Sequence, residues 1–134
     1  MRVNRPWHLP RAWPAFVSMP RMLAELAHDP QSGLLGCKRV WLRGGPVLVQ
    51  YWRDLDRLMA YATDKAKLHR PAWAAFNRSI GGDGSVGIWH ETYAVRAGNR
   101  ETIYTNMPRV GGARFGEHLT AQGARETARR RMTA

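Results

Sequence analysis

Two histidines lie where an imidazole could do acid–base chemistry. Of five histidines in the chain, His69 falls near the start of a predicted helix and His90 within a predicted strand. Counting in twos along that strand places His90 on the face of Val86 and Ile88, so we expect its ring to point with the apolar side chains. A buried neutral imidazole can accept a proton, position a substrate or bind iron. The alternatives are a hydrogen-bonded core histidine at position 90 and a partly exposed surface histidine at position 69.

Aromatic side chains exceed what the core of so small a domain needs. The chain holds 6 Trp, 4 Tyr and 3 Phe, and Tyr51, Trp52, Trp73 and Trp89 all fall in predicted helices or strands. Such an excess can line an apolar pocket or a dimer contact. A stacking platform for nucleic acid would instead alternate aromatic and basic residues on one exposed face. We therefore favour a pocket or a subunit contact.

General catalytic and metal-binding motifs do not occur in the sequence. It has no CxxC pair and no HExxH, P-loop or GxSxG motif, so metal and phosphate chemistry have no specific support. The glycine-rich string from Gly81 to Gly84 lacks the lysine of a phosphate loop and precedes a strand, which favours a turn. We expect no metal site.

The elements that would position these residues can be read from the apolar pattern. Leu34–Leu42 and residues 47–52 flank a Gly-Gly turn and predict a β-hairpin. Both runs hold consecutive apolar residues, so we expect cover on both faces of the sheet. Helices are expected over 12–28, with a kink at Pro20 or a restart capped by Ser18, and over 54–62 and 65–79; strands are expected over 86–95 and 101–105. This order is that of a split β-α-β unit without its first strand.

Length and charge limit the class of protein. The 134 residues carry a formal charge of +11 and a single cysteine, which fits one small domain in a reducing cytoplasm. No apolar run is long enough to span a membrane. The arginines are scattered along the chain, so nucleic-acid binding through the basic tail is a weak alternative. We expect a domain over 1–108 and a basic, flexible tail over 109–134.

Seven short strings keep a fixed order and spacing. They are Met1-Arg2-Val3-Asn4-Arg5, Met19-Pro20-Arg21-Met22 with Glu25-Leu26, Ser32-Gly33-Leu34-Leu35-Gly36, Val49-Gln50-Tyr51-Trp52-Arg53, His69 with Pro71-Ala72-Trp73 and Phe76-Asn77, Gly87-Ile88-Trp89-His90-Glu91-Thr92-Tyr93, and Tyr104 with Asn106-Met107-Pro108. Together, from residue 1 to about 110, they resemble a bacterial and fungal family of small monooxygenase-like proteins related to the fumagillin-pathway monooxygenase.

The resemblance implies an α+β, ferredoxin-like fold of the antibiotic-biosynthesis monooxygenase type. In such a dimeric α/β barrel, helices cover one face of a four-stranded antiparallel sheet and a second subunit covers the other. Family members have an apolar strand before the equivalent of Met1-Arg2-Val3-Asn4. We therefore expect the first strand to be missing or truncated here, through a start codon assigned too late or a shortened copy. We also expect a homodimer.

The resemblance also implies an activity. Relatives on this fold oxidise polycyclic or terpenoid substrates with O₂, often without a cofactor, and others bind haem through a helix histidine. In that case His90 is the general base or substrate anchor, His69 lies at the pocket mouth or ligates haem, and Arg21 stabilises negative charge on oxygen. The expected substrate-binding residues are Tyr51, Trp52, Trp73, Phe76, Asn77 and Tyr104. The alternative is a small-molecule binding protein without catalysis.

Overall fold

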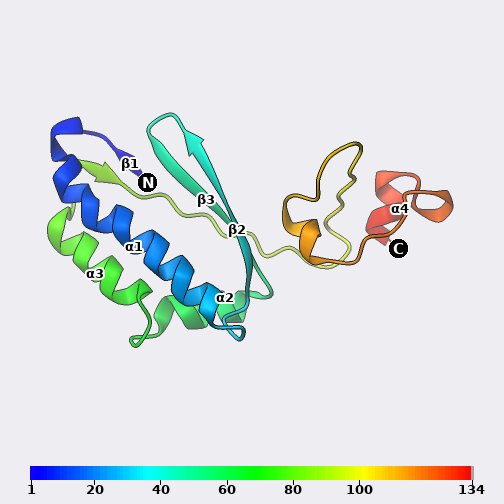
Figure 1. Cartoon of the computed structure of the whole chain (residues 1–134), viewed down its shortest axis with the longest axis horizontal. Coiled ribbons are helices and arrows are strands. Elements are labelled where there is room, and N and C mark those ends of the chain that lie inside the picture. Colours follow the sequence, from blue (N-terminus) through cyan, green and yellow to red (C-terminus); the bar gives the residue numbers. More distant parts are fainter. Residues whose placement is uncertain (134) are drawn as a thin grey trace. The chain divides into compact units, whose positions relative to one another are not determined.

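A computed structural model describes residues 1–133, which divide into two compact units, Met1–Glu91 and residues 92–133. The first unit is α+β and ferredoxin-like, as expected, with helices packed on strands (Figure 1). Its elements are β1 (Arg2–Val3), a 3₁₀ turn (Pro6–His8), α1 (Leu9–His28), β2 (Leu34–Leu42), β3 (Gly45–Trp52), α2 (Leu55–Thr63), α3 (His69–Ser79) and β4 (Val86–Gly87).

The predicted hairpin is confirmed. β2 and β3 pair antiparallel from Leu42 opposite Gly45 to Leu34 opposite Trp52, with one irregularity between Leu34 and Gly36. The turn requires glycine, because Gly44 has a φ of 107° and Gly45 a φ of 153°. Strand β3 starts at Gly45, two residues before the predicted start at residue 47.

The other strand pair is much shorter than predicted. β1 and β4 pair only through Arg2 with Gly87 and Val3 with Val86. The predicted strand over 86–95 is wrong beyond Gly87, and residues 101–105 form no strand in the part of the chain that the structure describes. Instead of one four-stranded sheet there are two sheets of two strands. A strand needs a ladder partner along its whole length, and β1 supplies two residues.

Helix α1 runs unbroken for 20 residues through Pro14 and Pro20. It begins at Leu9 instead of residue 12. Of the two alternatives expected at Pro20, a kink or a restart capped by Ser18, the restart does not occur, and the Ser18 hydroxyl donates to the Pro14 carbonyl at 2.7 Å inside the helix. Buried residues stand on both sides of Pro20, with Ala12 before it and Met22 after it. Their packing stabilises the helix at Pro20, which cannot donate a backbone hydrogen bond.

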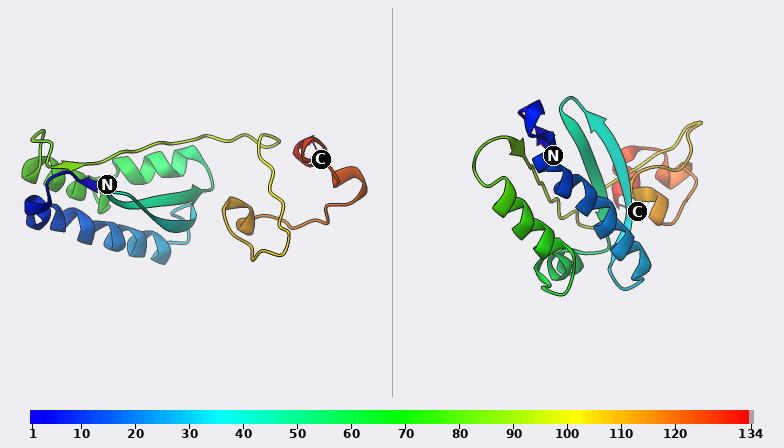
Figure 2. Two further views of the ribbon diagram at one scale, coloured as in Figure 1. Left: turned by 90° about the horizontal axis from the view of Figure 1, so that it is seen from above. Right: turned by 60° about the vertical axis from the view of Figure 1, so that its left-hand side comes forward.

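Two apolar clusters share α1. One joins Ala12, Ile80 and Val86, next to the β1–β4 pair. The other joins Met22, Leu26 and Tyr61, with Leu34 and Trp52 packed against it. α1 and α3 lie side by side along this layer (Figure 2). The helices thus connect the hairpin to the short strand pair through side chains.

The second unit contains short helical segments. They are two 3₁₀ turns, Gly112–Phe115 and Gly123–Arg125, and α4 (Ala128–Thr133). Arg131 Nε donates to Glu101 Oε1 at 2.7 Å, and this ion pair connects α4 to the start of the unit. Within residues 1–133, no helix combines the length and the apolar character that crossing a membrane requires.

Candidate functional site

Six rings from β3, α2, α3 and the segment after β4 form two short rows in the first unit, which we call the ring cluster. In one row Tyr61 lies 6.1 Å from Trp52 and 6.1 Å from His69, centroid to centroid. In the other, Trp73 lies 5.8 Å from Phe76 and 6.3 Å from His90. Five of the residues predicted for the site, Trp52, His69, Trp73, Phe76 and His90, therefore belong to this cluster.

Helix α3 contributes three of the six rings because of their spacing. His69, Trp73 and Phe76 stand at steps of four and three residues, so they share one face of the helix. His90 lies three residues after β4 and reaches Trp73 although it is not in a strand. The expectation that strand alternation turns His90 to the side of Val86 stays a prediction, because β4 ends at Gly87.

The pKa of the His90 ring lies below its ordinary value, mainly because the ring is partly buried. The residue as a whole is exposed, but partial burial of its ring lowers its pKa below the ordinary 6.5, and the positive charges of His69 and the Met1 ammonium lower it further. At neutral pH the ring therefore has a lone pair with which to accept a proton.

A backbone carbonyl fixes the orientation of His69. Its Nδ1 lies 3.0 Å from the carbonyl oxygen of Ala62, which can only accept, so Nδ1 carries the hydrogen. His69 is half-buried, with its ring tilted against Tyr61.

Sequence reasoning missed a hydrogen-bonded pair beside these rings. The Tyr61 hydroxyl donates to Glu25 Oε2 at 2.8 Å, and the same oxygen accepts from the Leu68 backbone N–H at 3.2 Å. Burial and the Glu25 carboxylate both raise the pKa of Tyr61. A signal existed, because Glu25 interrupts the apolar stripe of α1 next to Leu26. The pair secures α2 and the start of α3 to α1.

Four other predicted site residues lie outside the ring cluster. Arg21 and Asn77 are exposed on α1 and α3. Tyr51 follows strand alternation and faces away from Trp52, on the opposite side of β3. Tyr104 belongs to the second unit, where its hydroxyl donates to the Val110 carbonyl and its ring lies 5.9 Å from His118.

The first unit has two shallow cavities, and neither is lined by His69 or His90, the histidines predicted to be catalytic. One, of about 250 Å³, lies between β1, β3 and the segment after β4, and is lined by Met1, Val47 and Trp89 among others. The other, of about 210 Å³, lies at Asp29, Arg57 and Lys67. Neither lining includes His69 or His90. No group of three metal-binding side chains occurs within residues 1–133.

Comparison with known proteins identifies the family. No curated protein and no solved structure matches the chain. A family model does match it, over residues 1–111, and its description is monooxygenase af470-like. The match covers the whole first unit with its ring cluster, and the relation to the fumagillin-pathway enzyme stays a prediction. The chain belongs to the monooxygenase af470-like family.

Proposed function

We propose that this protein is a monooxygenase that oxidises a small apolar or aromatic substrate with O₂, using His90 as the general base. The observation that carries the proposal is the neutral His90 ring lying 6.3 Å from Trp73. The apolar face of Trp73 can hold a flat substrate while the imidazole takes its proton. The family name, which suggests a monooxygenase-like function, supports the same reaction class.

The reaction needs no reductant other than the substrate. His90 removes a proton from a CH₂ group that conjugation makes acidic, and the resulting carbanion reduces O₂. The carbon ends as a carbonyl and the second oxygen atom leaves as water, so that R₂CH₂ and O₂ give R₂CO and H₂O.

We propose that His69 does not bind haem. A hydrogen bond from Nδ1 to a carbonyl, as at His69, suits an axial ligand. However, Tyr61 packs against the ring, with centroids 6.1 Å apart. We therefore propose chemistry without a cofactor.

We further propose a cytoplasmic homodimer formed on the sheet face opposite the helices. On this face Val40 pairs with Val47 and Lys38 with Val49, and the Val49 side chain is 40% exposed. Apolar β-branched residues on an uncovered sheet face are typical of subunit contacts. Sedimentation as a 15.2 kDa monomer at all concentrations would contradict the dimer.

Oxygen uptake tests the activity. The substrates are electron-rich polycyclic ketones and phenols with an acidic CH₂, and the variants are His90→Ala and His28→Ala. His28 is a matched control, because it is an exposed histidine whose ring bonds only the Ala24 carbonyl of its own helix. We expect His90→Ala to slow uptake by about 10²- to 10⁴-fold, and His28→Ala to leave it unchanged. Binding of these compounds without any uptake would instead indicate a binding protein.

A further inference from the structure

Three exposed tryptophans lie near one end of the first unit. Trp7 belongs to the 3₁₀ turn before α1, Trp13 to the second turn of α1, and Trp41 to β2 close to the hairpin turn. Trp7 and Trp41 are each 74% exposed, and Leu9 is exposed as well. None of the four belongs to either apolar cluster of the core. Soluble monomers rarely expose apolar side chains in such groups, so this end has the composition of a binding surface.

The backbone places the 3₁₀ turn near the tip of the hairpin. β1 leads into that turn, and at its other end the Met1 nitrogen donates to the Pro46 carbonyl at 3.2 Å. The Arg2 side chain lies over the hairpin turn, since a Cβ added at Gly44 would come within 3.1 Å of its Cδ. The start of α1 and the hairpin tip accordingly lie at the same end of the unit (Figure 1). We call this end the tryptophan end and define it by Trp7, Leu9, Trp13, Trp41, Arg2, Arg5 and Arg43.

On α1 the exposed apolar side chains point away from α3. Leu9 and Trp13 stand four residues apart and share one side of the helix. Arg11, on the opposite side, donates to the Ser79 carbonyl at the end of α3 and forms an ion pair with Asp83 at 2.7 Å. The charge of this carboxylate is therefore neutralised by Arg11, on the side of α1 away from Leu9 and Trp13.

On the hairpin, Trp41 stands on the face toward the helices but is itself exposed. It pairs with Pro46, and Pro46 shares a face of β3 with Trp52, which packs against the core cluster that includes Leu26. The dimer proposed above uses the other face, where Val49 is exposed. That dimer therefore leaves Trp41 uncovered.

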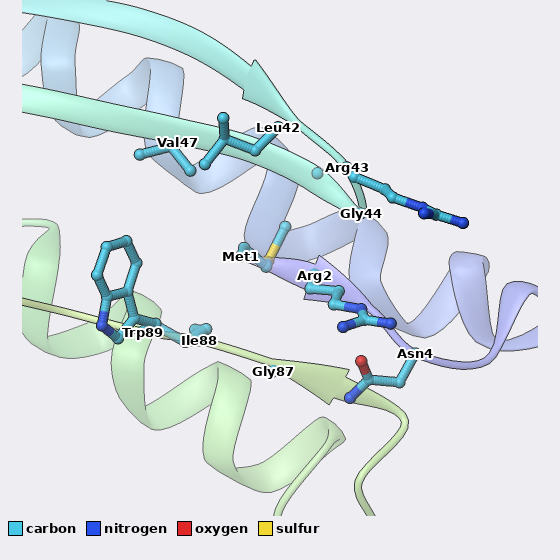
Figure 3. Close-up of a pocket in the computed structure, with 11 residues that line it drawn as sticks. Met1, Arg2, Asn4, Leu42, Arg43, Gly44, Val47, Gly87, Ile88 and Trp89 are labelled. Carbon is cyan, nitrogen blue, oxygen red and sulfur yellow. The ribbon is translucent and has the colours of Figure 1, made fainter.

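The charge of the tryptophan end is positive. Its three arginines are Arg2, Arg5 and Arg43, and the stretches 1–24 and 30–53 contain no aspartate or glutamate. The side chains of Arg2 and Arg43 extend in the same direction (Figure 3). Within residues 1–133, none of the three arginines forms an ion pair. A partner that fits this end supplies negative charge and an apolar layer together.

We propose that the tryptophan end binds the surface of an anionic lipid membrane. At such a surface indole rings lie at the level of the headgroups, and a leucine side chain reaches the boundary with the acyl chains. Arginines bind the anionic headgroups while their aliphatic stems stay against the apolar layer. The unit lies on the membrane without crossing it, in agreement with the lack of a spanning helix within residues 1–133. The inference does not depend on the proposed reaction.

Two other partners fit this end less well. The phosphate backbone of a nucleic acid would bind the arginines but offers nothing to Leu9, and a stacking platform needs rings that alternate with basic residues on one exposed face. A second copy of the chain, related by a twofold axis, would bring the same arginines together with no carboxylate between them, and like charges repel. Both alternatives are outcomes of the test.

Vesicle sedimentation tests the proposal on the full chain. The vesicles are phosphatidylcholine alone, or phosphatidylcholine with an equal part of phosphatidylglycerol. We expect binding to the anionic vesicles to be stronger by roughly tenfold or more, and to weaken at high salt. Trp7→Ala with Trp41→Ala should reduce this binding by roughly tenfold or more. The matched control is Leu55→Ala with Met59→Ala, which removes exposed apolar side chains from α2 and should leave binding unchanged.

A second pair of variants tests the charge. Arg5→Gln with Arg43→Gln removes two charges from the tryptophan end, and Arg53→Gln with Lys65→Gln removes two from exposed side chains elsewhere in the first unit. We expect the first pair to reduce binding to anionic vesicles by roughly tenfold or more, and the second to reduce it much less. Equal losses, or no binding to anionic vesicles by the natural chain, would overturn the proposal, since net charge alone would then account for any binding.

Fluorescence distinguishes insertion of the rings from adsorption by charge. Lipids with brominated acyl chains should quench the bound natural chain, and Trp7→Phe with Trp41→Phe should remove much of the quenching while most of the binding remains. Bound protein without quenching would overturn the proposal. Binding to duplex DNA that Trp7→Ala with Trp41→Ala weakens equally would assign the end to nucleic acid instead. Self-association that the same variant abolishes would assign it to a second copy.

Discussion

The hairpin and the pair of short strands show opposite outcomes of the same pairing chemistry. β2 and β3 have nine and eight residues and pair along their full length. β1 and β4 have two residues each, although the sequence after Val86 has more β-branched and aromatic residues than either hairpin strand. Propensity alone therefore does not decide whether a strand forms.

The difference lies in where each strand finds its partner. The partner of β2 follows it after a tight turn, so closing the ladder costs little chain entropy. The partner of β4 lies more than 80 residues earlier in the chain, at Arg2 and Val3. A local ladder is complete, whereas a nonlocal one extends only as far as its partner does.

The largest expected effect compares the two apolar clusters. Leu26 and Ile80 are 4% and 3% exposed, and each loses three carbon atoms on change to alanine. Leu26→Ala should lower the free energy of unfolding by about 3 to 5 kcal/mol and Ile80→Ala by about 2 to 3 kcal/mol. Leu26 is enclosed by the helices and the hairpin, while Ile80 lies beside the short strands, where the neighbours can relax into the space left. Urea unfolding measures both values.

The control for this comparison is the slope of the unfolding curve. Equal slopes show that both variants unfold from the same native state, so that the midpoints can be compared. A loss for Ile80→Ala as large as that for Leu26→Ala would mean that the short-strand end is as firmly packed as the hairpin end. The hairpin end and the short-strand end would then differ in strand length but not in how tightly their side chains pack.

Much of the fold could be predicted because it depends on local patterns. The hairpin follows from the Gly44-Gly45 turn between two apolar runs, and α2 from Asp54 before an amphipathic stretch. The extent of β4 could not be predicted, because it depends on a partner distant in sequence. The helix over 12–28 followed from its apolar stripe, whereas its start at Leu9 did not.

The candidate site was predictable to the extent that it rests on periodicity. His69, Trp73 and Phe76 share a helix face, as their spacing predicts, whereas His90 contacts Trp73 from outside the strand predicted for it. Tyr61 was missed because a tyrosine in an apolar helix stripe is indistinguishable from core until its hydroxyl partner, Glu25, is placed nearby. Tyr104 was assigned from resemblance alone and falls in the second unit.

A smaller effect is expected at the start of α2, which follows the hairpin directly. The Asp54 carboxylate accepts the Arg57 backbone N–H at 2.8 Å and caps the helix. Asp54→Ala should lower the free energy of unfolding by about 1 kcal/mol. Asp56→Ala is the matched control, since Asp56 is an acidic residue of the same first turn without the capping role, and its loss should be smaller. Thermal unfolding followed by circular dichroism measures both, and equal losses would show that charge near the helix end, not the cap, is what stabilises it.

The smallest expected effect concerns pH at the end of the molecule where the strands are short. The pKa of His90 lies below 6.5 in the folded protein, through partial burial, His69 and the Met1 ammonium. The unfolded chain therefore binds a proton at His90 more readily than the folded protein does. As the pH falls below about 6.5, this difference lowers the stability, and the loss is complete once the pH passes the folded pKa.

Replacing the imidazole separates this effect from other titrations. The midpoint of urea unfolding should fall less between pH 7.5 and pH 5.5 in His90→Gln than in the natural chain, while His28→Gln, at an exposed helix end, should follow the natural chain. If His90→Gln shows the full loss, His90 is solvated as in the unfolded chain, and the ring contact with Trp73 does not shield it. The acid sensitivity would then arise elsewhere, and the short-strand end would contribute no more to it than the hairpin does.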